Sequence, residues 1–132
     1  MIGLDTNVLV RLIVADDADH NRRAERFIES RCSSGDPGFI NTIVLCELAW
    51  VLTTAYGFGR GDVARVIEDL MASTDILLED RDAVSAALIN YRRGNIDFSD
   101  ALIERINHGH GCDATVTFDR KASKVPGFIP VP

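Results

Sequence analysis

The chain has 132 residues, 46% of them hydrophobic and 26% charged, which is typical of one globular domain and argues against intrinsic disorder. No apolar run approaches the roughly 20 residues that cross a bilayer, so we expect no membrane-spanning helix. The net charge of −6 argues against indiscriminate binding to a phosphate backbone.

Short apolar strands alternate with helices along the chain. The hydrophobic pattern and the turn residues predict strands at 2–4, 39–40, 76–78, 114–118 and 128–129. They predict helices at 8–14, 20–31, 43–56, 62–73, 81–91 and 98–108. This alternation indicates right-handed crossovers and a mainly parallel sheet of four to five strands, with helices on both faces. The predicted fold class is α/β, and without a repeat or linker we expect one domain, residues 1–132.

The start of the chain and its cysteines favour a cytoplasmic protein. Residues 1–4 lead directly into Asp5, without the basic stretch and long apolar core of a signal peptide. The three cysteines are widely spaced and form no paired-thiol motif, so we expect them to be reduced and mostly buried.

Two aspartates follow predicted strands. Asp5 comes directly after the first strand, and Asp119 comes after the fourth. Ligands of open parallel sheets bind beyond the carboxyl ends of the strands, where these side chains would lie. For either aspartate alone, a turn or helix-capping role is the favoured explanation.

Glu47 lies in a stretch, residues 43–52, that is apolar nearly all round, as is typical of a buried helix. It shares a helix face with Ile43 and Val51. A carboxylate in such a setting is costly unless it is paired, protonated or bound to a metal. The pattern therefore favours a functional role for Glu47.

Asp97 and Asp100 flank the start of the predicted helix at 98–108. An N-cap role explains Asp97 well, and a first-turn acid complements the helix dipole at Asp100. Considered with Asp5, Glu47 and Asp119, Asp100 also fits a metal site. Carboxylate oxygens are the ligands of Mg²⁺ and Mn²⁺, which activate water for phosphodiester hydrolysis.

Four segments, in order, resemble the signature of PIN domains. They are residues 3–9 (GLDTNVL), 44–48 (VLCEL), 97–103 (DFSDALI) and 117–120 (TFDR). Each segment is weak alone, but the ordered set is specific and spans almost the whole chain. The short chain looks most like VapC, the toxin of prokaryotic VapBC toxin–antitoxin systems.

The resemblance implies a three-layer α/β/α sandwich and a metal-dependent endoribonuclease. By position, it implies that Asp5 and Asp100 are principal ligands of Mg²⁺ or Mn²⁺, with Glu47 and Asp119 completing an acidic quartet. Supporting roles fall to Asn7, Thr117 and Asp97. It further implies a homodimer, a VapB-like antitoxin as protein partner, and a structured RNA substrate such as tRNA or rRNA.

Several other signals are weaker. A zinc site at His108, His110 and Cys112 fits no standard spacing, so a helix stop and loop are favoured. Trp50 and Tyr56 are better explained by a core or a dimer interface than by base stacking. Many basic side chains could contact RNA phosphates. A solvated face is preferred for the residues at 22–31, and the better candidates beside Asp119 are Arg120 and Lys121, with Arg92, Arg93 and Lys124 also possible.

Two other functions share parts of this pattern. A Mg²⁺-dependent phosphatase with Asp5 as nucleophile would carry a second aspartate where this chain has Asn7, and a lysine before its final acids, where none occurs. A non-catalytic binding module would keep the fold for a protein partner. The full set of acids argues against that module.

Overall fold

In the computed structural model, which describes residues 1–132, the chain forms two units, Met1–Glu79 and Asp80–Pro132. The elements of the first unit are β1 (Ile2–Gly3), α1 (Thr6–Ile13), α2 (Ala18–Arg31), β2 (Gly38–Ile40), α3 (Thr42–Thr54), α4 (Arg60–Ala72) and β3 (Ile76–Leu78). The elements of the second are α5 (Arg81–Arg92), α6 (Phe98–Gly109), β4 (Thr115–Thr117), the 3-10 helix η1 (Ala122–Lys124) and β5 (Phe128–Pro130).

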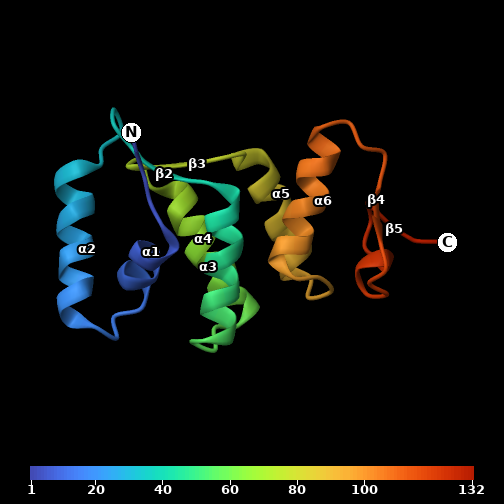
Figure 1. Ribbon diagram of the computed structural model, residues 1–132, viewed down its shortest axis with the longest axis horizontal. Helices are drawn as coiled ribbons and strands as arrows, with labels where there is room; N and C mark the ends of the chain where they lie inside the picture. The colour runs from blue at the N-terminus through green and yellow to red at the C-terminus, as the bar shows by residue number, and fades with distance from the viewer. The chain divides into compact units, whose positions relative to one another are not determined.

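The first unit is built on three parallel strands in the order β1-β2-β3. Two helices connect each strand to the next, as parallel pairing requires a crossover. Gly38 lies where the strands crowd: an added Cβ would lie 2.7 Å from Cδ1 of Leu4. The helix α1 packs against both α2 and α3 (Figure 1). The core of this unit is made by the buried residues of α1, α3 and α4 together with Ile40 of β2 and Leu78 of β3, whereas α2 buries no residue.

The second unit joins the helix pair α5 and α6 to the parallel strands β4 and β5 (Figure 1). Tyr91 and Phe98 meet edge to face, with ring centroids 5.9 Å apart. Nδ2 of Asn107 on α6 donates to Oγ1 of Thr115 on β4 at 3.0 Å. These contacts fix both the start and the end of α6, and α6 begins with the acidic segment identified in the sequence.

Glu104 is the one acidic side chain buried in the second unit. It is 3% exposed and accepts two hydrogen bonds from Arg105, at 2.6 and 2.8 Å. Gly127 lies against it, with φ at +96°, and an added Cβ would lie 2.2 Å from Oε1 of Glu104. A glycine is required here for two reasons, the backbone conformation and the close approach.

The α/β class and the parallel strands are confirmed, and every predicted helix and strand is present. The five strands pair as a three-stranded sheet and a two-stranded sheet. No helix combines the length and the apolar character that crossing a membrane requires. The prediction of mostly buried cysteines is correct for Cys32 alone, because Cys46 is half-buried and Cys112 is exposed in the loop after α6.

Candidate active site

Asp5 ends the extended segment after β1 and is the N-cap residue of α1. Its carboxylate accepts a hydrogen bond from the backbone N–H of Thr6 at 2.8 Å. The capping role foreseen as the simple explanation is therefore real. The carboxylate of Asp5 is also exposed to solvent, which leaves it free for a second partner. Asn7, in the first turn of α1, is exposed as well.

Glu47 does not lie in an apolar interior, and this prediction was wrong. The helix α3 buries only the stripe formed by Leu45, Leu48, Ala49 and Leu52. Glu47 is exposed on the opposite side, where Ile43 and Trp50 are 75% and 66% exposed. The apolar residues on this solvent-facing side made the helix resemble a buried one. The core role predicted for Trp50 is excluded for the same reason.

The acidic segment of the second unit begins at Asp97, the N-cap residue of α6. Asp100 follows in the first turn and is half-buried. Burial raises the pKa of the Asp100 carboxyl above its usual value, and the negative charges of Asp97 and Asp119 raise this pKa further. The three aspartates are therefore close enough for their charges to interact.

Asp119 follows β4 and is held in a tight turn. Its Oδ1 accepts hydrogen bonds from the backbone N–H groups of Lys121 at 2.8 Å and Ala122 at 3.1 Å. The backbone N–H of Asp119 donates to Oγ1 of Thr117 at 3.0 Å. Thr117 thus positions Asp119 within the second unit.

The structure brings together three of the predicted residues, Asp97, Asp100 and Asp119. Asp5 and Glu47 belong to the first unit. No three acidic, histidine or cysteine side chains surround a common point as they would around a bound metal. The donor set nevertheless suits a hard divalent cation, because it consists of carboxylate oxygens. A cation would also relieve the repulsion that raises the pKa of Asp100.

One feature of the second unit was missed in the sequence. A cleft of about 440 Å³ lies between the α5–α6 connection and η1, and it is lined by Asn90, Arg93, Gly94, Asn95, Lys121, Lys124, Val125 and Pro126. The available signal was the spacing of Lys121 and Lys124, which are the only two lysines of the chain. Arg120, the other predicted substrate contact, is exposed beside them.

A family model described as PIN domain matches residues 2–127, nearly the whole chain. A comparison with curated proteins gave no match.

Proposed function

The chain belongs to the PIN domain family, and from this premise we propose that it is a Mg²⁺- or Mn²⁺-dependent endoribonuclease that acts as the VapC-type toxin of a toxin–antitoxin pair. PIN domains are generally Mg²⁺-dependent nucleases. The specific activity on RNA and the toxin role are the proposed steps. Both rest on the four matching sequence segments, which occur in family order.

The observation that carries the proposal is the group of like charges in the second unit. Asp100 is half-buried, and its pKa is raised by its own burial and by the charges of Asp97 and Asp119. Carboxyl groups with perturbed pKa values are concentrated at functional sites. A divalent cation is the ligand that three carboxylates favour, and an anionic substrate can approach once that cation is bound.

We assign the metal and catalytic roles to Asp5, Asp100, Glu47 and Asp119. When bound, the metal would lower the pKa of a water molecule and stabilise the negative charge at the phosphorus. The protein's own contribution is orientation. The capping hydrogen bond from Thr6 fixes the carboxylate of Asp5, and the turn at residues 119–122 fixes that of Asp119.

The remaining residues support these ligands. Thr117 holds the backbone of Asp119, and Asp97 adds negative charge beside Asp100. Asn7 stands in the exposed first turn of α1, two residues after Asp5. As partners we propose a VapB-like antitoxin, a second copy of the chain in a homodimer, and a structured RNA such as tRNA or rRNA, all in the cytoplasm.

The test is cleavage of total cellular RNA by the purified protein, with Mg²⁺, with Mn²⁺ and with EDTA, followed by mapping of the new RNA ends. We expect discrete cuts that require metal and disappear in Asp5→Asn. The matched control is Asp113→Asn, which removes an exposed carboxylate from the loop after α6 and should cut like the wild type. Cleavage by Asp5→Asn at the wild-type rate would overturn the assignment. Absence of cleavage by the folded wild type with either metal would favour a binding module.

A further inference from the structure

The cleft of the second unit is strongly cationic. Three of its eight lining residues are basic, namely Arg93, Lys121 and Lys124, and no acidic residue lines it. None of these three side chains forms an ion pair or a hydrogen bond. Both lysines of the chain are among them. In a chain of net charge −6, three unpaired cations around one cleft are a specific concentration of positive charge.

The cleft also offers neutral hydrogen-bonding groups. Asn90 lies half-buried near the end of α5, and Asn95 lies in the connection to α6. Between them Gly94 has φ at +86°, a conformation that lets the chain turn tightly under the cleft. Side-chain amides can donate to the oxygen atoms of an anion that the cations attract. At about 440 Å³, the cleft is within the range of roughly 300–1,000 Å³ typical of sites for small ligands.

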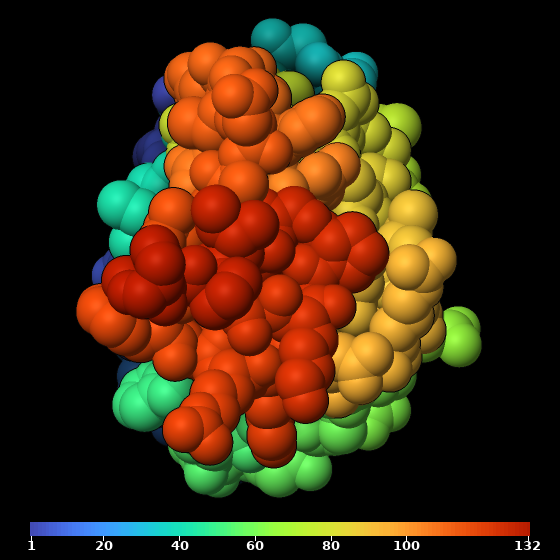
Figure 2. All heavy atoms as spheres, turned by 90° about the vertical axis from the view of Figure 1, so that its right-hand side faces the viewer, coloured from blue at the N-terminus to red at the C-terminus, as the bar shows by residue number.

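Both walls of the cleft lead directly to the acidic residues. One wall, residues 93–95, is followed two residues later by Asp97 at the start of α6. The other wall begins at Lys121, whose backbone N–H donates to Oδ1 of Asp119 at 2.8 Å. Figure 2 shows the two walls side by side, with the golden α5–α6 connection next to the red C-terminal segment. Whatever anion the cleft holds is therefore adjacent to the candidate metal ligands of this unit.

We propose that this cleft binds a backbone phosphate of the RNA substrate beside the bond that is cut. The inference rests on the proposed nuclease function and adds to it the residues that grip the substrate. Arg93 and Lys124 neutralise the phosphate from opposite walls, and Asn90 and Asn95 hydrogen-bond to its oxygens or to the adjoining ribose. The cations of the cleft attract the anionic substrate and so offset its repulsion by the neighbouring aspartates.

The acidic residues next to the cleft indicate which class of anion it binds. An acidic protein segment would also be attracted by the three cations. Only a polynucleotide, however, presents its next phosphate to the carboxylates and their metal at the spacing of a continuous backbone. The cleft and the acidic group are therefore better explained as two parts of one substrate path.

The experiment measures binding of a labelled single-stranded oligouridylate to the protein in EDTA over a series of salt concentrations. Each phosphate neutralised in a single strand contributes about 0.7 to the slope of log Kobs against log salt concentration. We expect the double variant Arg93→Gln, Lys124→Gln to bind more weakly and to lower the slope by about 0.7, because both side chains neutralise the same phosphate. Lys124→Arg, which keeps the charge, should retain the wild-type slope.

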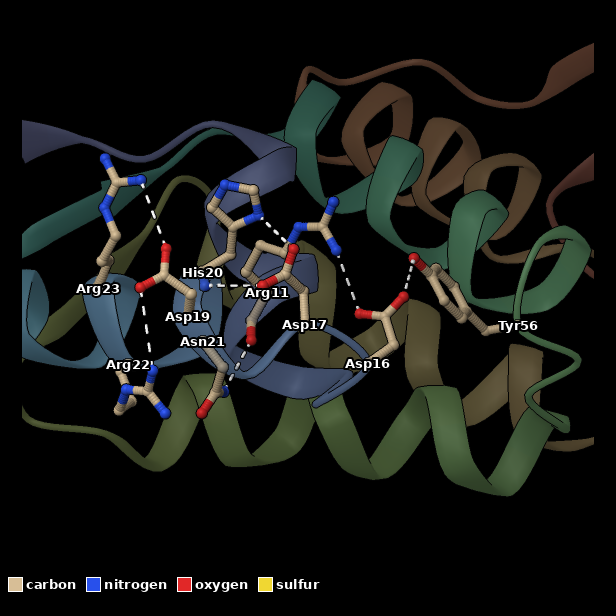
Figure 3. A network of polar contacts seen from close by, with 9 residues as sticks. All are labelled: Arg11, Asp16, Asp17, Asp19, His20, Asn21, Arg22, Arg23 and Tyr56. Carbon is tan, nitrogen blue, oxygen red and sulfur yellow. Dashed lines mark hydrogen bonds and ion pairs between the residues drawn. The ribbon is translucent and has the colours of Figure 1, made fainter.

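The matched control is Arg22→Gln, Arg23→Gln, which removes two exposed cations that pair with Asp19 on α2 (Figure 3). It should leave the slope unchanged. An unchanged slope in the cleft variant, with an intact circular dichroism spectrum, would overturn the inference. A second contradicting result is a cleft variant that still binds RNA but no longer binds a polyglutamate of matched charge. That result would assign the cleft to an acidic protein partner.

These outcomes are separate from those of the nuclease test, because binding in EDTA requires neither metal nor cleavage. If the wild type cuts RNA and the cleft variant keeps the wild-type salt slope, only the proposal that the cleft binds phosphate is contradicted. If the wild type binds RNA through the cleft but does not cut it, only the proposed nuclease function is contradicted.

Discussion

The two units of the chain differ in how they distribute charge. Met1–Glu79 contains 13 acidic and 7 basic residues, so it carries the whole net charge of −6. Asp80–Pro132 contains seven of each and is neutral. In the first unit many charges pair locally: Arg11 bonds Asp16, and Arg22 and Arg23 lie near Asp19 (Figure 3). In the second unit the charges of Asp97 and Asp119 act on Asp100, and three unpaired cations line the cleft.

This difference shows why the net charge is a poor guide to the substrate. Exposed local pairs such as those in Figure 3 contribute little to stability and cancel each other's field at a distance. Separated groups of like charge act over a longer range and can hold ligands of opposite sign. The proposed binding of RNA by this acidic protein would therefore use its neutral second unit.

The largest effect that we expect in this comparison is that of Asp100→Asn. Metal-dependent cleavage should fall by more than about a hundredfold, beyond the 10–100-fold typical of residues that only support a metal ligand. A fluorescent RNA containing a mapped site measures the rate. Loss of less than tenfold would exclude Asp100 as a principal ligand.

The stability of the same variant provides its control. The raised pKa of Asp100 means that the ionised form is disfavoured in the folded state. Stability is therefore lost as the pH rises from the unfolded pKa through the folded one, and the neutral asparagine removes that loss. We expect Asp100→Asn to unfold at the same temperature as the wild type or higher at pH 7. A lower unfolding temperature would show that the carboxylate has a structural role instead.

The second prediction compares one glycine from each unit. Gly127→Ala must place a Cβ 2.2 Å from Glu104 at positive φ, so we expect it to destabilise the protein by at least about 1–3 kcal/mol. Gly61→Ala adds a Cβ to α4 in open space and should stabilise the protein by up to about 1 kcal/mol. Urea denaturation measures both. An unchanged free energy of unfolding in Gly127→Ala would contradict the close packing of Gly127 against Glu104.

The third prediction separates stacking from charge. Phe118, directly before Asp119, is 88% exposed, and an exposed aromatic ring beside the proposed nuclease site could stack on an RNA base. We expect Phe118→Ala to weaken RNA binding by about 1–3 kcal/mol without changing the salt slope. Phe27→Ala, at a 40% exposed position on α2, should have no effect. A change in salt slope at Phe118 would show that the variant disturbs the cleft.

The smallest effect is expected at Asp36 in the first unit. Hydrogen bonds from the N-terminal amine and from Arg31 lower the pKa of its carboxyl below its usual value. The resulting stability is present above the unfolded value and is lost as the pH falls through the folded value. Asp36→Asn should therefore melt slightly earlier than the wild type at neutral pH and low salt, with no difference in strong acid. A difference that persists in strong acid would point to a cause other than charge.

Local signals made most of the fold predictable. Asn41, a residue type that favours helix starts, caps α3: its Oδ1 accepts a hydrogen bond from the backbone N–H of Val44 at 2.8 Å. The strand at Ile76–Leu78 was predicted to the residue, because three apolar residues stand between turn signals. Asp97 and Asp119 likewise take the cap and turn positions that their neighbours indicated.

Features that depend on distant contacts were not predictable in the same way. The apolar side of α3 at Ile43 and Trp50 faces solvent, and only tertiary packing decides which side of an all-apolar helix is buried. The cleft joins Asn90 to residues more than thirty positions later in the chain, and no periodicity reports such a pairing. The sequence identified Asp97, Asp100 and Asp119 by their positions after a strand and at a helix start. Only the structure showed that their negative charges repel one another.

The central claim is that the carboxylates of Asp5, Glu47, Asp100 and Asp119 hold a divalent metal. A calorimetric titration of the purified protein with Mn²⁺ tests this claim most directly. We predict binding by the wild type and by Asp113→Asn, and loss of binding in both Asp5→Asn and Asp100→Asn. A wild type that binds no Mn²⁺, or an Asp100→Asn variant that binds it unchanged, would contradict the account.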